Sequence, residues 1–136
     1  MNFKFYKENH LRKKKDFEKV YNEGRQINGK YFICFILKND LNLPRLGLTV
    51  SKKIGKAVIR NRVKRLLREI FRLNKRLLIE PVDIIINAKK NIIEADFQKL
   101  SKSYQYVVNA EMRSIKRNAH CAFPTKAELN NNEEIL

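Results

Sequence analysis

The 136-residue chain lacks the features of a membrane-spanning, secreted or disulfide-stabilised protein. Its longest apolar runs, such as residues 31–37, fall far short of the roughly 18 residues that a membrane-spanning helix needs. The N-terminus, Met-Asn-Phe-Lys-Phe-Tyr-Lys, has no apolar core of the kind found in signal peptides. Two cysteines are too few for a disulfide framework, and Cys34 lies in an apolar run where a buried thiol is expected. These absences favour a cytoplasmic protein.

The sequence is also poor in grouped catalytic side chains. A metal-dependent nuclease needs clustered carboxylates, whereas Asp16, Asp83 and the other aspartates are far apart in the sequence. His10 and His120 lie toward the ends of the chain without an evident catalytic partner. The chain has neither the Cys/His spacing of a zinc site nor a glycine-rich phosphate loop. We therefore expect no catalytic residue and no organic cofactor in this chain.

Positive charge is what the sequence has in excess. The net charge is +16 and the pI is about 10.1. Eleven of the 30 Lys and Arg residues lie between positions 51 and 76, where Glu69 is the only carboxylate. Hydrophobic residues make up 43% of the chain, enough for a folded core rather than a disordered basic tail. A short basic segment on a folded domain indicates a polyphosphate partner, and nucleic acid is the leading candidate.

Residues from Gly55 to about Leu78 are predicted to form an amphipathic helix. The apolar stripe steps by four and three residues through Ile59, Val63, Leu66, Ile70, Leu73 and Leu77. The opposite face carries Asn61, Lys64, Arg65, Arg68, Arg72, Lys75 and Arg76, with Arg60 and Arg62 on the flanks. Solvent-exposed helix faces usually mix charges of both signs, whereas on this polar face the cations one turn apart repel one another. A phosphate-binding helix is therefore favoured over a merely solvated one.

The remaining pattern predicts one α/β sandwich with helices against a small sheet. The expected elements are a helix over Leu11–Asn22 ended by Gly24, strands over Tyr31–Leu37 and Leu46–Ser51 that pair as a hairpin, a strand over Val82–Ala88 buried on both faces, and a helix over Glu94–Lys116. The basic run at residues 12–15 lies at the wrong end of the first helix for the helix dipole, and a nearby phosphate would account for it. Residues 1–8 form an N-terminal extension, and the polar residues 118–136 are expected to be a poorly ordered tail.

Aromatic side chains form a second candidate surface. Phe17 and Tyr21 share one face of the first predicted helix. On the first strand, one face carries Phe35 with Tyr31, Ile33 and Leu37, and the other carries Phe32, Cys34 and Ile36. One set must face the core, while the other could form a surface on which unpaired bases stack. Spacing alone favours core packing for the aromatic residues.

Residues 51–71, Ser-Lys-Lys-Ile-Gly-Lys-Ala-Val-Ile-Arg-Asn-Arg-Val-Lys-Arg-Leu-Leu-Arg-Glu-Ile-Phe, closely resemble the signature of the bacterial ribonuclease P protein family. The similarity includes residues 16–24, residues 45–50 and the strand at 82–88, and it covers about residues 9–117. The resemblance implies an αβββαβα sandwich, a two-layer α+β fold with a small mixed sheet and a left-handed βαβ crossover. It also implies that the protein binds a catalytic RNA and promotes RNA-catalysed removal of the 5′ leader from precursor tRNA.

The resemblance further implies two sets of binding residues. The catalytic RNA is expected to contact Lys52, Lys53, Lys56, Arg60, Asn61, Arg62, Lys64, Arg65 and Arg68. The single-stranded leader is expected in a central cleft at Phe17, Tyr21 and Phe35. Mg²⁺ ions are expected to be held mainly by the RNA, and no obligate protein partner is evident. Two rivals remain open: a general structured-RNA or ribosome-associated protein, and a membrane-surface protein with a basic amphipathic helix.

Overall fold

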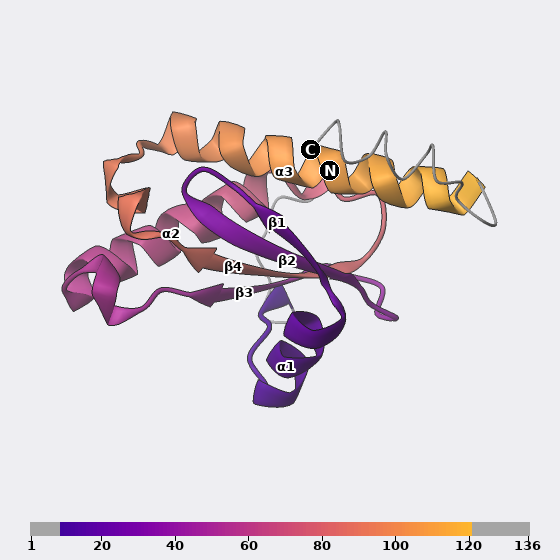
Figure 1. Ribbon diagram of the computed structural model, residues 1–136, viewed down its shortest axis with the longest axis horizontal. Helices are drawn as coiled ribbons and strands as arrows, with labels where there is room; N and C mark the ends of the chain where they lie inside the picture. Colours follow the sequence, from indigo (N-terminus) through magenta and orange to yellow (C-terminus); the bar gives the residue numbers. More distant parts are fainter. Residues whose placement is uncertain (1–8, 121–136) are drawn as a thin grey trace.

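A computed structural model describes residues 9–120 of the chain (Figure 1). The elements follow the order α1 (Lys14–Glu23), β1 (Arg25–Asn28), β2 (Phe32–Lys38), β3 (Arg45–Thr49), α2 (Ala57–Leu73), β4 (Val82–Ala88) and α3 (Phe97–His120). Three short 3₁₀ helices connect them: η2 (Lys52–Ile54), η3 (Lys75–Leu77) and η4 (Lys90–Glu94). The helix and strand order agrees with the αβββαβα arrangement that the resemblance implies.

The four strands form one mixed sheet with the order β1-β2-β4-β3. β1 and β2 are an antiparallel hairpin, β2 and β4 are antiparallel, and β3 runs parallel to β4. The chain therefore crosses from β3 through α2 to its parallel neighbour β4. The predicted hairpin between the strands at 31–37 and 46–51 is wrong, because β4 lies between β2 and β3. Residues 82–86 of β4 are all buried, whereas burial alternates along β2, and a strand buried on both faces takes a central place in a sheet.

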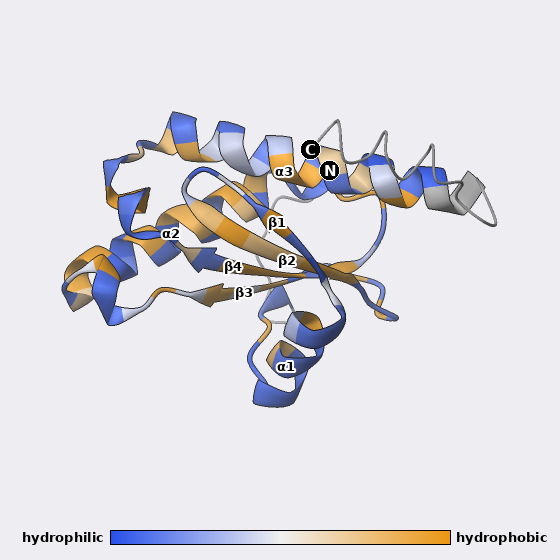
Figure 2. Cartoon of the chain, in the orientation of Figure 1, coloured by the Kyte–Doolittle hydropathy of each residue, from blue (hydrophilic) through white to orange (hydrophobic). Residues whose placement is uncertain are grey.

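Helices cover both faces of this sheet, and they do so unequally. α2 and α3 lie on one face, and α1 lies on the other (Figure 1). The main core contains Phe32 and Cys34 of β2, Leu67 of α2 and Tyr104 of α3. The hydropathy colouring shows apolar residues along the strands and on the inner sides of these helices (Figure 2). A smaller cluster under α1 includes Ile85, so β4 is buried on both faces as predicted.

The boundaries of α1 differ from the predicted helix for identifiable reasons. The helix begins at Lys14 rather than Leu11, because His10 pairs with Leu46 of β3 and the Leu11 amide donates to the Leu46 carbonyl at 2.9 Å. Gly24 ends the helix in an extended conformation with φ −76°, which leads directly into β1. A Cβ at Gly24 would lie 2.4 Å from the Val20 carbonyl oxygen, so only glycine permits this close approach.

Other details of the predicted pattern also shift. The buried stripe of α2 starts at Val63, because Ile59 in the first helical turn is 39% exposed. Tyr31 is buried in the main core and does not share the face of Phe35. α3 begins after η4 and extends to His120, so residues 118–120 of the predicted tail belong to this helix. Residues 1–8 and 121–136 lie outside the described residues.

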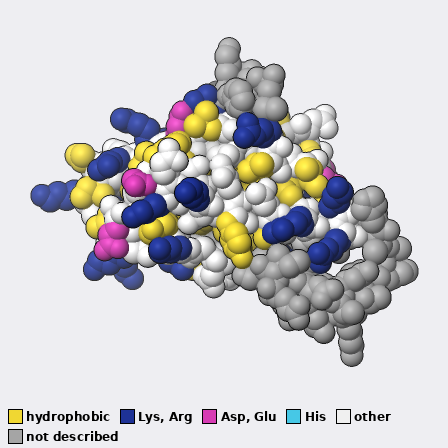
Figure 3. Space-filling model, turned by 90° about the horizontal axis from the view of Figure 1, so that it is seen from above, with side chains coloured by type: hydrophobic (Ala, Val, Ile, Leu, Met, Phe, Trp, Pro, Cys, Tyr) yellow, Lys and Arg dark blue, Asp and Glu magenta, His cyan; other side chains and the backbone are white. Residues whose placement is uncertain are grey.

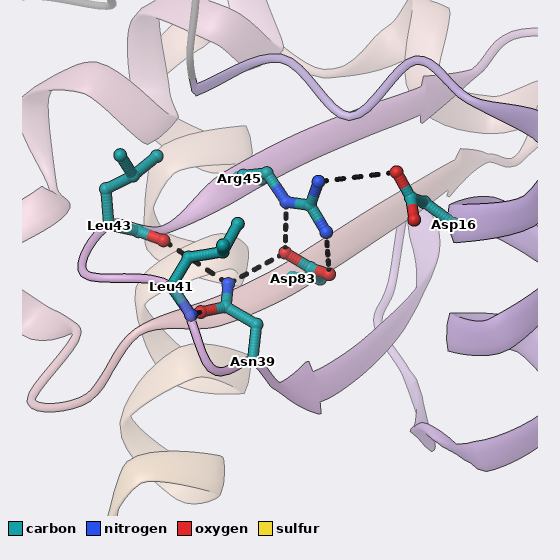
Figure 4. A network of polar contacts seen from close by, with 6 residues as sticks. All are labelled: Asp16, Asn39, Leu41, Leu43, Arg45 and Asp83. Carbon is teal, nitrogen blue, oxygen red and sulfur yellow. Dashed lines mark hydrogen bonds and ion pairs between the residues drawn. The ribbon is translucent and has the colours of Figure 1, made fainter.

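A polar network joins α1 to the ends of β3 and β4 (Figure 4). Arg45 donates from Nε and Nη2 to the two carboxylate oxygens of Asp83 at 2.8 and 2.6 Å. Its Nη1 donates to Asp16 of α1 at 3.3 Å, and Asn39 Nδ2 donates to Asp83 at 2.8 Å. The hydrogen bonds from Arg45 to Asp83 raise the pKa of Arg45 and hold its guanidinium group in one orientation. The network therefore fixes where α1 sits on the sheet.

Candidate RNA interface

The outer face of α2 is basic because the apolar stripe of this helix packs into the core. Val63, Leu67, Ile70 and Phe71 are buried against the sheet and α3. The predicted RNA-binding side chains of this helix then point outward: Asn61, Arg62, Arg65 and Arg68 are exposed, and Arg60 and Lys64 are half-buried. The burial of the apolar stripe also leaves α2 no continuous apolar face with which to enter a membrane surface.

The charge on this face is uncompensated within the helix. Glu69 is the only carboxylate of α2, and it pairs with Arg72 through both guanidinium Nε, at 3.1 Å, and Nη2. The hydrogen bond from Arg72 lowers the pKa of Glu69, so this carboxyl stays ionised and stays with its partner. The other cations of α2 therefore have no carboxylate in their own helix, as expected for a phosphate-binding face.

The turn before α2 adds three more lysines to this face. Lys52, Lys53 and Lys56 are all exposed around η2. Gly55 adopts φ 151°, a conformation open mainly to glycine, and this turns the chain from η2 into the helix. Arg60 Nε donates back to the Gly55 carbonyl at 3.2 Å and ties the turn to the first helical turn. The first turn of α2 has no acidic residue and no side-chain cap, so its amides favour an anion.

The three aromatic residues predicted to line a cleft come together under α1. Tyr21 contacts Phe35 edge-on with ring centroids 4.8 Å apart, and Phe17 lies 6.3 Å from Tyr21. The Tyr21 hydroxyl donates to Asn87 Oδ1 at 2.9 Å and lies 3.1 Å from Thr49 Oγ1. These bonds tie α1 to β3 and β4. All three rings are half-buried, so core packing and surface exposure are both part of their role.

A pocket joins the aromatic cluster to the basic helix. This α1–α2 pocket, with a cavity volume of about 220 Å³, is lined by His10, Leu11, Arg12, Phe17, Leu46, Leu48, Lys64 and Arg68. It lies across the edge strand β3, between α1 on one face of the sheet and α2 on the other. Gly47 makes the close packing possible, because a Cβ there would lie 2.6 Å from Phe17 Cζ. The pocket therefore combines an aromatic ring with three cationic side chains.

Two polar side chains of this pocket, His10 and Arg12, are not among the binding residues predicted from the sequence. His10 lies near one end of the sequence, yet in the fold it is held beside β3. Burial, then Arg12 and Arg68, lower the pKa of His10, which favours the neutral imidazole in the absence of an anion. Arg12 belongs to the basic run at residues 12–15, whose place at the start of a helix is unfavourable for the helix dipole. In the fold, Arg12 lines the same pocket as Arg68. The only sequence signal was that unfavourable placement at the helix start.

The predicted binding residues do not all share one surface. Lys64 and Arg68 line the α1–α2 pocket, whereas Arg62 lies on the other flank of α2 beside Ile93 and Ala95. The outer face between these flanks carries Asn61 and Arg65. Of the aromatic residues, Phe17 lines the pocket, while Tyr21 and Phe35 support it from the cluster under α1. The candidate interface thus has an exposed basic face and a pocket along one side of it.

Residues 9–120 offer neither a metal centre nor a membrane span. No group of three or more His, Cys, Asp or Glu residues in this range is arranged to hold a metal ion. Asp16 and Asp83, far apart in the sequence, meet at Arg45, which occupies their oxygens in ion pairs. No helix within the described range is long and apolar enough to cross a bilayer.

Comparisons with known proteins agree with the motif. The family model described as Ribonuclease P matches residues 5–111. The ribonuclease P protein components of Alkaliphilus oremlandii and Clostridioides difficile are 42% and 43% identical, over 74% and 72% of this chain and 88% and 87% of theirs. The structure of RNase P protein from Thermotoga maritima superposes with a TM-score of 0.68 at 34% identity, over 74% of this chain and 94% of that one. The Staphylococcus aureus RNase P protein gives a TM-score of 0.68 at 32% identity, over 74% and 92% of the two chains. The chain therefore belongs to the ribonuclease P protein family and is a protein subunit of the ribonucleoprotein endoribonuclease that processes the 5′ ends of tRNA.

Proposed function

We propose that the protein binds the 5′ leader of precursor tRNA in the α1–α2 pocket while the outer face of α2 binds the ribonuclease P RNA. The observation that carries the proposal is the composition of the pocket: Phe17, Lys64 and Arg68 line one cavity. An aromatic ring beside cations is the arrangement that binds single-stranded nucleic acid, because bases stack on the ring while phosphates meet the charges. The leader is the single-stranded part of the substrate.

The placement of the pocket beside the basic face gives the two RNAs adjacent sites. Lys64 and Arg68 stand at the boundary, on the same helix as Arg65 and Asn61. Their charge lowers the repulsion between the catalytic RNA and the leader, which are both polyanions. The subunit then acts by positioning the substrate rather than by supplying a catalytic side chain.

A leader site explains how the ribonucleoprotein would distinguish substrate from product. Mature tRNA lacks the leader, so contacts made by Phe17 are available to the precursor alone. Because these contacts raise affinity only for the precursor, the product is released without competing at this site. Discrimination therefore depends on the pocket, whereas assembly with the catalytic RNA depends on the outer face of α2.

We propose that the RNA, rather than the protein, holds most of the Mg²⁺. The described carboxylates do not fit a metal site, since Asp16 and Asp83 are engaged by Arg45. When bound to the catalytic RNA, Mg²⁺ would activate the attacking water. What the protein contributes is cationic charge from α2, which makes the crowding of RNA phosphates around those ions less unfavourable. We place this activity in the cytoplasm, where precursor tRNA is available.

The pocket is tested by replacing Phe17 with leucine. Phe17→Leu keeps an apolar side chain against Gly47 and removes the ring on which a base stacks. Precursor tRNA should bind the reconstituted ribonucleoprotein more weakly by about 1–3 kcal/mol, the contribution of one stacked base. Binding of mature tRNA should not change. Equilibrium binding of both RNAs, with thermal melts to confirm folding, is the measurement; an equal loss for both would remove the leader from this pocket.

The alternative function, that of a general structured-RNA or ribosome-associated protein, predicts a different result in the same assay. It predicts comparable binding of precursor tRNA, mature tRNA and unrelated structured RNA, and no effect of Phe17→Leu on their ratio. No observation on the described residues favours it over the leader pocket.

A further inference from the structure

α3 carries a second polar stripe that differs in character from an ordinary solvated helix face. Its exposed residues recur at alternating intervals of three and four, which places them along one side of the helix: Lys99, Lys102, Tyr106, Asn109, Arg113 and Lys116. The one carboxylate within Phe97–His120, Glu111, is buried and faces Arg25 of β1. Seen from above, the molecule shows Lys and Arg side chains interspersed with hydrophobic ones (Figure 3). The outward side of α3 is therefore cationic, with a single aromatic residue near its middle.

The C-terminal half of this stripe borders a groove between α3 and η3, here called the α3 groove. Its cavity volume is about 510 Å³. Leu77, Ile79 and Met112 supply apolar surface, and the Tyr106 ring forms part of the wall. Tyr106 and Ile79 are each 55% exposed, so this apolar and aromatic surface is open to solvent.

Cations surround this apolar surface. Arg76 of η3 and Arg113 and Lys116 of α3 line the groove, and no carboxylate is among the described residues that line it. An occupant that matches the groove must combine negative charge with a flat, largely apolar body. A nucleotide has that combination, because its base can stack on Tyr106 while its phosphate meets the arginines.

The position of the groove indicates which RNA reaches it. Arg76 lies four residues beyond Arg72 at the C-terminal end of α2, so the groove adjoins the basic helix. The α1–α2 pocket lies toward α1 and the edge strand β3, whereas α3 covers the other face of the sheet. An RNA bound along α2 can continue into the groove.

We propose that the α3 groove binds an unpaired nucleotide of the ribonuclease P RNA, with its base on Tyr106 and its phosphate at Arg76 and Arg113. α3 then extends the contact with the catalytic RNA around a second side of the protein. This role is independent of the leader site, so precursor and mature tRNA should be distinguished normally when the groove is altered.

The test measures binding of the full-length protein to ribonuclease P RNA alone, without tRNA, over a range of salt concentrations. Tyr106→Ala should weaken binding by about tenfold, as expected for the loss of one stacked base, whereas Tyr106→Phe, which keeps the ring, should bind like the wild type. Arg113→Ala should flatten the slope of log affinity against log salt by about 0.7, the value for one single-strand phosphate. Chemical probing of the RNA should show an unpaired nucleotide that is protected by the wild type and exposed with Tyr106→Ala.

Lys99→Ala is the matched control for Arg113→Ala, because it removes one cation from the same side of α3 about 21 Å from Arg113 along the helix axis and outside the groove. It should leave the protected nucleotide unchanged. Wild-type affinity and protection with Tyr106→Ala would overturn the proposal. The proposal would also be wrong if Tyr106→Ala had no effect on RNA binding in a chain that ends at His120. The occupant of the groove would then be residues 121–136 of the protein itself. Binding to anionic phospholipid vesicles that depends on Tyr106, with unchanged RNA binding, would equally assign the groove to a membrane surface.

Discussion

Among single residues, Glu111 links the packing of α3 to pH. Its carboxyl is buried and lies 3.3 Å from Arg25 Nε, and Arg25 also donates to Ser114 Oγ at 3.0 Å. Burial raises the pKa of Glu111, and the nearby Arg25 charge opposes this shift only in part. The folded protein therefore retains a proton at Glu111 to a higher pH than the unfolded chain does.

This difference gives the stability a predictable dependence on pH. Above the ordinary carboxyl pKa of 4.5, the folded state binds more protons at Glu111 than the unfolded state, so this residue's contribution to stability falls as pH rises through the folded pKa. Glu111→Gln cannot ionise and removes that dependence. The free energy of unfolding of the wild type minus that of the variant should therefore decrease as pH rises above 4.5. Urea unfolding at several pH values measures it; a difference that increases with pH would contradict the burial argument.

At the scale of elements, the basic face of α2 should account for the salt sensitivity of RNA binding. Replacing Arg65 and Arg68 with alanine removes two exposed cations without touching the buried stripe. Affinity for the ribonuclease P RNA should fall, and the slope of log affinity against log salt should flatten by about one for each phosphate that is no longer neutralised. The matched control is the double variant Lys30→Ala, Lys38→Ala, which removes two exposed cations, one between β1 and β2 and one at the end of β2. Equal slopes for both double variants would mean that net charge, rather than α2, governs binding.

Local patterns predicted these elements better than their pairing. The apolar stripe and basic face of α2 follow from helical periodicity, and β4 follows from its near-continuous apolar run. The partner of β2 could not be predicted in the same way, because β4 lies some 45 residues further along the chain and intervening turns do not encode that pairing. β1 is short and Ile27 is its only apolar residue, so it lacks a strand signal of its own.

The candidate sites show the same contrast. The residues of the basic face were predictable because they are neighbours on one helix. The α1–α2 pocket was not, since His10, Phe17, Leu48 and Lys64 come from four separate segments that meet only in the fold. The outward cations of α3 gave a weaker signal, because the sequence alone does not show that Glu111 is buried while the cations of the same helix are exposed.

For the whole molecule, three surfaces follow from one arrangement of helices around the sheet. The Arg45 network positions α1 (Figure 4), the core fixes α2 and α3 on the opposite face, and β3 forms the edge between α1 and α2. The α1–α2 pocket lies along one flank of α2, and the α3 groove begins at Arg76, just beyond the C-terminal end of that helix. The contacts proposed for the catalytic RNA and for the leader are therefore adjacent, which would let the protein hold the two RNAs together without contributing to bond cleavage.

The most direct test of this account is the rate of 5′ cleavage of precursor tRNA by ribonuclease P RNA at low Mg²⁺, with and without the protein. Two substrates should be compared, one with a leader of several nucleotides and one with a leader of a single nucleotide. The account predicts that the protein restores cleavage at low Mg²⁺, that it does so more strongly for the longer leader, and that Phe17→Leu removes this preference while leaving the common stimulation. Failure to stimulate cleavage, or equal stimulation of both substrates by the wild type, would contradict it.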